Sequence, residues 1–259
     1  MMLQFFKYHG AGNDFIMIDN RDQAFTPTVQ GVKHLCDRHY GIGADGLILL
    51  ETQNGLPFMR YFNCDGNEST MCGNGGRCFA GFAKKIGLAN GLSFDFHGID
   101  GMHTAIFNTD GTVKLKMIDV ESLELIDDCY FINTGSPHYV TMVRDVNGID
   151  VEREGRLIRQ SVNFNSGGTN VNFIQEIAPG RIKIRTYERG VEAETLACGT
   201  GATASAIAYS HFFDINQTPI EVEALGGSLK VYFNQVEGKY RNVWLEGPAK
   251  EVFEGKINY

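Results

Sequence analysis

The sequence has few prolines, no long apolar run and no cluster of basic side chains. Only 6 of its 259 residues are proline whereas 31 are glycine, a balance that favours many tight turns, as in a strand-rich protein. No apolar run approaches the length that crosses a membrane. The 23 Lys and Arg residues are dispersed among 31 Asp and Glu residues, and the net charge is −8. We therefore expect neither a nucleic-acid partner nor a membrane partner.

The cysteines lack the spacing of metal and redox motifs. None of the six forms a Cys-x-x-Cys pair, which argues against a zinc knuckle or a thioredoxin-type motif. The first ten residues turn polar too soon for a signal peptide. Without an export signal, the thiols are expected to be reduced in a cytoplasmic compartment.

Other motifs of metal and nucleotide chemistry are also missing. There is no His-Glu-x-x-His motif, and no histidine pair is joined by carboxylates at metal spacing, so no metal site is predicted. Gly41–Gly46 matches Gly-x-Gly-x-x-Gly. A strand-like run follows it and no strand precedes it, whereas a dinucleotide site needs a strand before and a helix after.

Short strand-like runs bounded by Gly, Asn and Asp dominate the chain, and helical patterns are sparse. Thr28–Arg38 is one candidate helix. After Cys72, Phe79, Phe82, Ala83 and Ile86 fall on one helical face. After Cys198, small residues surround a second helix, as is typical of a buried helix with backbones close around it.

The chain resembles itself at a fixed offset. Cys72–Gly75 reads Cys-Gly-Asn-Gly, and Cys198–Gly201, 126 residues later, reads Cys-Gly-Thr-Gly. Glu68 and Glu194 precede the two cysteines at the same offset. Several matches at one offset indicate an internal duplication, although coincidence among glycine-rich turns is the alternative.

The duplication and the scarcity of helices together predict the fold class. Too few helices exist to cover both faces of a parallel sheet, so a Rossmann-type fold is disfavoured. We predict an α+β protein of two pseudo-symmetric domains, each a curved, mostly antiparallel sheet wrapped round a central helix. Residues 1–118 carry Cys72 and residues 119–247 carry Cys198.

Two thiols at the starts of two equivalent helices suggest a specific chemistry. A helix N-terminus favours the thiolate and offers N–H donors to an anion. If both thiols faced one carbon, one could remove a proton while the other delivered a proton to the opposite face. The helix N-termini would stabilise the charge that develops on an adjacent carboxylate. This pattern favours a racemase or epimerase that uses no cofactor.

Two other classes of function stay open on the residues alone. One thiol, Cys72 or Cys198, could act as a nucleophile activated by His138 in a hydrolase or transferase. The chain could also be a small-anion-binding protein or a redox switch that pairs the two thiols. The hydrolase or transferase with a single nucleophilic thiol leaves the duplication unexplained.

Several segments, in order along the whole chain, are similar to diaminopimelate epimerases. They are Phe6–Phe15, Arg38–Gly46, Asn63–Gly66, Cys72–Cys78, Gly135–His138, Gly168–Val171 and Glu188–Gly201. The family interconverts LL- and meso-diaminopimelate in lysine and cell-wall precursor synthesis, without pyridoxal phosphate or any other cofactor. The resemblance implies two domains that open and close, commonly in a homodimer, with residues 248–259 returning to the first domain.

The same resemblance assigns roles to individual residues. Cys72 and Cys198 would be the acid/base thiols, tuned by His138 and Glu188. Backbone donors at Gly73, Asn74, Gly199 and Thr200 would bind the carboxylate at the reacting carbon. The distal end of the substrate would be held by Asn13, Asn63, Asn170, Glu188 and Arg189.

The sequence departs from some family members in the binding residues. Gly46 stands where certain relatives carry glutamine, and Ser136 stands where they carry asparagine. The segment Val191–Ala193 is one residue longer than the usual spacing. Related epimerases act on histidine or proline analogues, so another amino acid is the alternative substrate.

Overall fold

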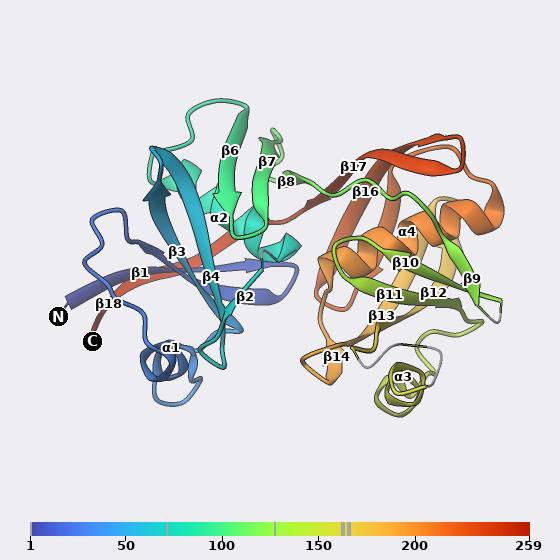
Figure 1. The fold of residues 1–259 in the computed structure, drawn as a ribbon, viewed down its shortest axis with the longest axis horizontal. Helices are drawn as coiled ribbons and strands as arrows, with labels where there is room; N and C mark the ends of the chain where they lie inside the picture. Colours follow the sequence, from blue (N-terminus) through green and yellow to red (C-terminus); the bar gives the residue numbers. More distant parts are fainter. Residues whose placement is uncertain (1, 71, 127, 162–163, 165–166) are drawn as a thin grey trace. The chain divides into compact units, whose positions relative to one another are not determined.

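The computed structural model describes residues 2–70, 72–126, 128–161, 164 and 167–259. The chain divides into two compact units, Met1–Leu115 with Gly247–Tyr259, and Lys116–Glu246. Figure 1 labels most of the elements of both.

The first unit contains two helices and nine strands among its described residues. They are β1 (Met2–Gly10), β2 (Asn13–Asp19), α1 (Val29–Cys36), β3 (Gly46–Gln53), β4 (Leu56–Asn63), β5 (Glu68–Ser69), α2 (Gly73–Lys85), β6 (Ser93–Gly98), β7 (Gly101–Phe107), β8 (Val113–Lys116) and β18 (Lys250–Asn258). The last residue of β8 already belongs to the second unit. Strand β18 pairs antiparallel with β1, so the chain's last strand lies beside its first.

The second unit repeats this order. It contains β9 (Glu124–Ile126), β10 (Cys129–Asn133), β11 (Pro137–Met142), α3 (Val151–Arg159), β12 (Asn170–Ala178), β13 (Arg181–Glu188), β14 (Ala193–Thr195), α4 (Gly199–Phe213), β15 (Ile220–Ala224), β16 (Gly227–Val236) and β17 (Lys239–Gly247), whose last residue lies in the first unit. Strand β9 pairs antiparallel with β10, as β18 pairs with β1.

Strand pairing within the two units confirms the duplication. β2–β3 and β4–β6 are parallel in the first unit, and β11–β12 and β13–β15 are parallel in the second. The other described pairs within each unit are antiparallel, including the short β4–β5 and β13–β14 pairs before the central helices. Each unit is therefore the same supersecondary unit, and the predicted α+β class with two pseudo-symmetric halves is confirmed.

Each central helix packs among the strands of its own unit. In α2, Phe79, Phe82 and Ala83 of the predicted face are fully inaccessible to solvent, whereas Ile86 is the half-buried C-cap residue. Phe79 packs on Phe96, with ring centroids 4.9 Å apart. In α4, Ala202, Ala204, Ala206, Ile207 and Ala208 are at most 1% exposed. Burial on all sides explains why this helix has small residues almost all round.

A tight hairpin positions the first predicted binding residue. Gly10 pairs with Asn13 across β1 and β2, which leaves a two-residue turn at Ala11 and Gly12. Both turn residues have positive φ, at 54° and 86°. This geometry matches the right-handed twist of the strands, and it places Asn13 at the start of β2.

Candidate active site

Both predicted thiols are the N-cap residues of the central helices. Cys72 precedes α2 and Cys198 precedes α4, each with an extended backbone conformation. In α1 and α3 the N-cap side chains of Thr28 and Asp150 accept a hydrogen bond from a first-turn N–H. Neither cysteine side chain caps its helix in this way. The first turns of α2 and α4 therefore present N–H donors of the kind that bind anions.

In the first unit, Cys72 lies against the Asn13 amide. The Cys72 Sγ donates to Asn13 Oδ1 at 3.6 Å, and Asn74 Nδ2 donates to the same oxygen at 3.4 Å. Asn13 Nδ2 donates to Asp45 Oδ2 at 2.8 Å. Because a carboxylate only accepts, this contact fixes the amide so that its oxygen faces the thiol.

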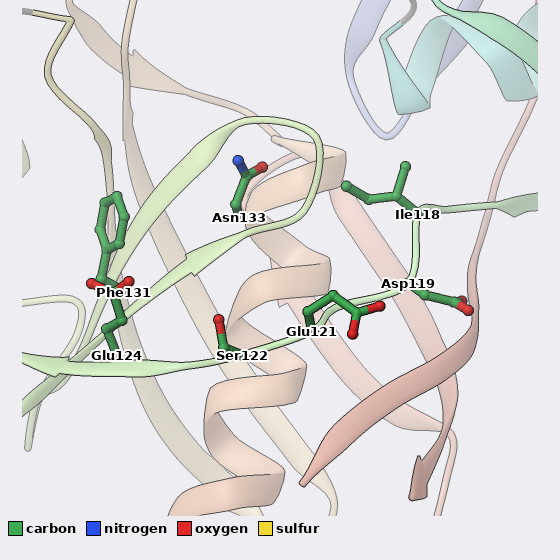
Figure 2. A pocket seen from close by; sticks show the side chains of 7 residues that line it. All are labelled: Ile118, Asp119, Glu121, Ser122, Glu124, Phe131 and Asn133. Atoms are coloured by element: carbon green, nitrogen blue, oxygen red, sulfur yellow. The ribbon is translucent and has the colours of Figure 1, made fainter.

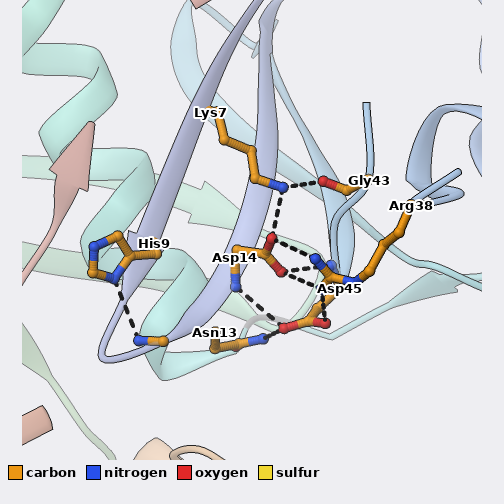
Figure 3. A network of polar contacts seen from close by, with 8 residues as sticks. Lys7, His9, Asn13, Asp14, Arg38, Gly43 and Asp45 are labelled. Carbon is orange, nitrogen blue, oxygen red and sulfur yellow. Dashed lines mark hydrogen bonds and ion pairs between the residues drawn. The ribbon is translucent and has the colours of Figure 1, made fainter. Parts of the chain in front are cut away.

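An ion network that is buried at Lys7 and Asp14 and more exposed at Arg38 and Asp45 holds Asn13 in place (Figure 3). Lys7 Nζ lies 2.6 Å from Asp14 Oδ2 and also donates to the Gly43 carbonyl. Arg38 bridges Asp14 and Asp45, at 2.7 Å and 2.8 Å. Burial alone would raise the pKa of Asp14, but the hydrogen bonds from Arg38 and Lys7 lower it to about 2. Asp14 is therefore ionised, and the network presents Asn13 in one orientation.

Asn74 is fixed from within the helix. Arg77 Nη2 donates to Asn74 Oδ1 at 2.8 Å, and its Nη1 donates to the Gly73 carbonyl at 3.2 Å. Arg77 is fully buried, and burial lowers its pKa from the usual value. Its hydrogen bonds satisfy the guanidinium inside the first unit and hold the start of α2 rigid.

Asn63 lies at the end of β4, opposite Gly46 on β3. Its backbone N–H donates to the Asn67 carbonyl at 3.0 Å. The packing explains the glycine at position 46, since a Cβ there would lie 2.6 Å from Tyr61 Cε2 and 2.7 Å from the Phe62 carbonyl oxygen. No side chain fits at Gly46 without movement of this pair of strands.

In the second unit, Cys198 is joined to His138 through two hydroxyl groups. Cys198 Sγ lies 3.4 Å from Thr200 Oγ1, which lies 3.1 Å from Ser136 Oγ. Ser136 Oγ lies 2.9 Å from His138 Nε2. His138 is fully buried; burial, and secondarily the charge of Arg189, lowers its pKa to about 3. The imidazole is therefore neutral at physiological pH.

Two asparagines of β12 hold this group from the other side. Asn172 Nδ2 contacts His138 Nδ1 at 3.1 Å and donates to the Tyr139 carbonyl at 3.1 Å. Asn170 Nδ2 donates to the Pro137 carbonyl at 2.8 Å, and Asn170 Oδ1 accepts from the Arg189 backbone N–H at 2.9 Å. Both side chains are buried. The hydrogen bonds of Asn170 connect β11 with the residue that follows β13.

The side chains of Glu188 and Arg189 contact different groups. Glu188 Oε2 accepts from Thr195 Oγ1 at 2.8 Å, and Arg189 Nη1 donates to the Gly167 carbonyl at 3.4 Å. The structure thus places Asn170 and the Arg189 backbone N–H close to His138. Glu188 instead contacts Thr195, which belongs to β14.

The glutamates of the repeat have equivalent structural partners. Glu68 accepts from Arg60 of β4 at 2.9 Å, and Glu194 accepts from Arg185 of β13 at 2.6 Å and 2.7 Å. Each ion pair ties the short strand before a central helix to the long strand beside it. The repeated glutamate is therefore explained by its part in fixing the thiol-bearing segment.

Two of the remaining cysteines are buried and unreactive. Burial raises the pKa of Cys36 and that of Cys78 to about 12. Cys64 is exposed and Cys129 is half-buried. All six cysteines are free thiols. The buried pair fits the usual role of a structural cysteine.

Other features of the described residues lie apart from these groups. A cavity of about 260 Å³ in the second unit is lined by Ile118, Asp119, Glu121, Ser122, Glu124, Phe131 and Asn133, none of which is a predicted site residue (Figure 2). No cluster of three or more His, Cys, Asp or Glu side chains that could hold a metal ion occurs in the described part of the chain. None of the described helices is long and apolar enough to cross a membrane.

Sequence reasoning missed several residues that position the predicted ones. They are Lys7, Asp14, Arg38, Asp45 and Asn172. The alternation of Asn170 and Asn172 in a strand was an available signal, because residues two apart share one face. The four members of the ion network come from separate elements, but all of them lie in Phe6–Phe15 and Arg38–Gly46, two of the segments that carry the family resemblance.

Comparison with protein families gives a match over nearly the whole chain. The family model described as diaminopimelate epimerase matches residues 5–122 and 130–252. A diaminopimelate epimerase of Flavobacterium psychrophilum is 48% identical over 257 residues, which span 98% of this chain and 100% of the relative. A diaminopimelate epimerase of Aquifex aeolicus is 38% identical over 99% of this chain and 98% of its own length.

Solved structures with the same fold are more distant in sequence. A phenazine biosynthesis protein of the PhzF family from Bacillus anthracis superposes with a TM-score of 0.79 at 14% identity, covering 100% of both chains. A hydroxyproline epimerase from Agrobacterium vitis, with bound trans-4-hydroxy-L-proline, gives 0.70 at 14% identity over 99% of this chain and 92% of that chain. At these identities the likeness establishes the fold alone.

Proposed function

Because the chain belongs to the diaminopimelate epimerase family, its reaction is the epimerisation of diaminopimelate, and we propose that Cys72 and Cys198 are the two acid/base thiols. The enzyme is an isomerase, EC 5.1.1.7, of lysine and diaminopimelate biosynthesis. The observation that supports the two-thiol assignment is the repeat: both thiols are N-cap residues of equivalent central helices.

In the proposed mechanism each half, 1–118 with 248–259 and 119–247, contributes one thiol. One sulfur, as thiolate, takes the α-proton of the substrate, and the other, as thiol, gives a proton to the opposite face of the same carbon. The product leaves the two sulfurs with their protonation states exchanged, so the reverse reaction uses the same groups in opposite roles. No proton or electron is gained or lost overall.

The helix starts supply the charge stabilisation that this carbanion chemistry needs. Backbone N–H groups at Gly73–Asn74 and at Gly199–Thr200 would bind the carboxylate next to the reacting carbon. That carboxylate carries the negative charge that develops when the proton leaves. The macrodipoles of α2 and α4 add to the same effect.

The distal end of the substrate would be held by polar residues already fixed by the protein. Asn13 is oriented by Asp45, and Asn170 is oriented by Pro137 and Arg189. We assign Asn63, Glu188 and Arg189 to the same end, where opposite charges suit an ammonium and a carboxylate. Glu188 and His138 complete the proposal as the groups that tune the thiols.

Location and assembly form a separate part of the proposal. Six free thiols suit a reducing cytoplasmic compartment, and a homodimer follows from the family resemblance. Sedimentation of the purified protein tests the dimer: a monomer at every concentration would contradict it.

The decisive experiment follows solvent hydrogen into the product. In deuterated water, the wild-type protein incubated with LL-diaminopimelate should give the meso form with one deuteron at the inverted carbon. Cys72→Ser and Cys198→Ser should each lower the epimerisation rate by about 10²–10⁴-fold, the usual value of a positioned acid or base. Cys64→Ser removes an exposed thiol and serves as the matched control, which should retain the wild-type rate. Normal turnover by either catalytic variant would contradict the two-thiol mechanism.

A further inference from the structure

We propose that Ser136 and Thr200 are positioning residues that connect His138 to Cys198 by a one-directional chain of hydrogen-bond donors, and that this chain favours the thiolate of Cys198. The inference rests on the proposed function of Cys198 as an acid/base thiol. It goes further in naming the groups that act on the sulfur and the order in which they act. The four atoms involved are joined by contacts of 2.9, 3.1 and 3.4 Å.

The direction of this chain of hydrogen bonds is set at its buried end, where Asn172 contacts His138. A backbone carbonyl only accepts, so the contact with the Tyr139 carbonyl fixes Nδ2 of Asn172 on that side of the amide. Asn172 Oδ1 accepts from Thr186 Oγ1 at 3.0 Å on the other side. The second hydrogen of Nδ2 then points at His138 Nδ1, which must be the accepting nitrogen of the ring.

A neutral imidazole with an accepting Nδ1 carries its proton on Nε2. His138 Nε2 therefore donates to Ser136 Oγ. The Ser136 hydroxyl, having accepted from the ring, donates to Thr200 Oγ1, and the Thr200 hydroxyl donates to Cys198 Sγ. Each group passes one hydrogen bond on towards the sulfur, which is the last acceptor. Ser136 Oγ also accepts from Asn170 Nδ2 at 3.4 Å, so both of its acceptor positions are used and its proton is directed to Thr200.

The ionisable groups around the chain leave this direction unchanged. His138 is fully buried and remains neutral, since burial and the charge of Arg189 both oppose its protonation. Strand β13, the neighbour of β12, contributes Glu188, which is bound to Thr195. Arg189 follows Glu188 and approaches the group through its backbone N–H to Asn170. On α4 itself, the N-terminal N–H groups also favour negative charge at the sulfur.

A donor chain that ends on sulfur stabilises the thiolate more than the thiol. Hydrogen bonds to a charged acceptor are stronger than those between neutral groups, and members of a chain polarise one another. The hydroxyl protons stay on their own oxygens throughout. The proton that Cys198 takes comes from the substrate carbon and returns to a substrate carbon in the reverse reaction.

Cys72 of the first unit contacts a different kind of group. There the neighbouring atom is Asn13 Oδ1, an acceptor whose orientation is fixed by Asp45. A thiol can donate to that oxygen, whereas a thiolate gains nothing from it. The repeat therefore places one sulfur beside an amide oxygen and the other beside a hydroxyl group.

The test measures the alkylation rate of Cys198 as a function of pH in the ligand-free protein. Iodoacetamide reacts with the thiolate, and peptide mass spectrometry follows each cysteine separately. Thr200→Val removes the hydroxyl at nearly constant shape and keeps the backbone N–H. It should move the midpoint of the Cys198 profile upward by about one pH unit, and Ser136→Ala should move it by a smaller amount.

Conservative and matched variants separate the chain from general packing. Ser136→Thr and Thr200→Ser keep a hydroxyl and should restore a midpoint near the wild-type value. Thr203→Val is the control on the same helix, because the Thr203 hydroxyl is buried but donates to the Gly199 carbonyl instead. It should leave the Cys198 profile unchanged.

The outcomes distinguish this proposal from the proposed function. Unshifted profiles in both Thr200→Val and Ser136→Ala, or an equal shift in Thr203→Val, would overturn the donor chain. Epimerisation by Cys198→Ala at the wild-type rate would overturn the function of the thiol, whatever the alkylation profiles show. A shifted profile in the two removal variants, together with loss of turnover in Cys198→Ala, supports both.

Discussion

The Asn13 amide faces Cys72 because a buried ion pair holds the strand that carries it. Lys7 and Asp14 have side chains only 8% and 16% exposed, and they lie 2.6 Å apart. Removing one member of such a pair leaves the other charge buried without its partner. Asp14→Asn should therefore lower the free energy of unfolding at pH 7 by about 2–4 kcal/mol, measured by urea denaturation.

The pH dependence of that loss has a defined sign. Because its hydrogen bonds lower the pKa of Asp14 to about 2, its contribution is fully present above about pH 4 and is lost as the pH falls towards 2. The gap between wild type and Asp14→Asn should narrow over that interval. Asp19→Asn breaks an exposed pair with Arg21 and should cost less than about 1 kcal/mol. Equal losses in the two variants would contradict this interpretation of the network.

Because the His138 ring is buried, the free energy of unfolding depends on pH in the mildly acidic range. In the unfolded chain a histidine takes up a proton below about pH 6.5, whereas burial keeps His138 neutral in the fold until about pH 3. The unfolded state thus binds more protons between these values, and stability falls with falling pH by about 1.4 kcal/mol per unit from this residue. The free energy of unfolding should therefore differ less between pH 7 and pH 5 in His138→Gln than in the wild type, by about 2 kcal/mol.

Denaturation curves at pH 7, 6 and 5 check this prediction. His39→Gln, at an exposed histidine, is the control and should keep the wild-type slope with pH. A His138→Gln protein whose stability falls as steeply as that of the wild type would show that the ring is protonated in the folded state.

At the scale of single elements, the pairing of β3 and β4 depends on the absence of a side chain at residue 46. A Cβ on Gly46 would lie 2.6 Å from Tyr61 Cε2 and 2.7 Å from a backbone oxygen, and the backbone cannot move aside like a flexible side chain. Gly46→Ala should lower the free energy of unfolding by about 1–3 kcal/mol, as overpacking does. It should also slow turnover, since β3 and β4 place Asn63 and Asp45.

A glycine at which a Cβ would make only ordinary van der Waals contacts gives the matched comparison. A Cβ on Gly91 would come no closer than 3.6 Å to any atom, and its φ is not in the left-handed region. Gly91→Ala should change stability by less than about 0.5 kcal/mol. If thermal unfolding shows the two variants to be equally stable, close packing at Gly46 is not what excludes a side chain there.

The central helices could be predicted from local pattern, but two other elements could not. The spacing of Phe79, Phe82 and Ala83 identifies the buried face of α2 because it arises within one helix. Helix α3 is rich in charge, and it packs closely through Gly155, where a Cβ would lie 2.4 Å from Tyr187 Cβ. Strand β1 lacks alternation because Phe5–Tyr8 is buried on both faces. Both depend on contacts with distant segments.

For the candidate site, too, the residues could be predicted from local sequence, but their contacts could not. The two thiols, His138 and Asn170 follow from repeated or recognisable motifs in the sequence. The contacts that orient them do not, because Asn172 meets His138 only through the parallel pairing of β11 with β12. The sequence shows that Ser136 replaces the asparagine of some relatives. It does not show that Ser136 is hydrogen-bonded to His138 and Thr200, because those contacts form only in the folded protein.

At the scale of the whole molecule, the repeat continues through its last strands. Strand β9 follows the first repeat and pairs with β10, and β18 follows the second repeat and pairs with β1. Strand β9 thus belongs to the unit that contains β10, and β18 belongs to the unit that contains β1. The duplication at an offset of 126 residues predicts the repeated elements, but the pairing partner of a terminal strand is a long-range contact that the offset does not specify.

The β1–β18 pairing makes the stability of the first unit depend on the last residues of the chain. Phe253 packs on Phe5 with ring centroids 5.9 Å apart, Tyr259 packs on Phe25 at 4.9 Å, and Ile257 borders the same apolar core. A chain that ends at Pro248 would leave β1 as an unpaired edge and uncover these rings. Amide hydrogen exchange in β1 and α2 should become at least about tenfold faster, a loss of about 1.4 kcal/mol of local stability. Strands β12 and β13 provide the internal reference and should exchange at the wild-type rate, so uniform acceleration in both units, or none in β1, would contradict a role confined to the first unit.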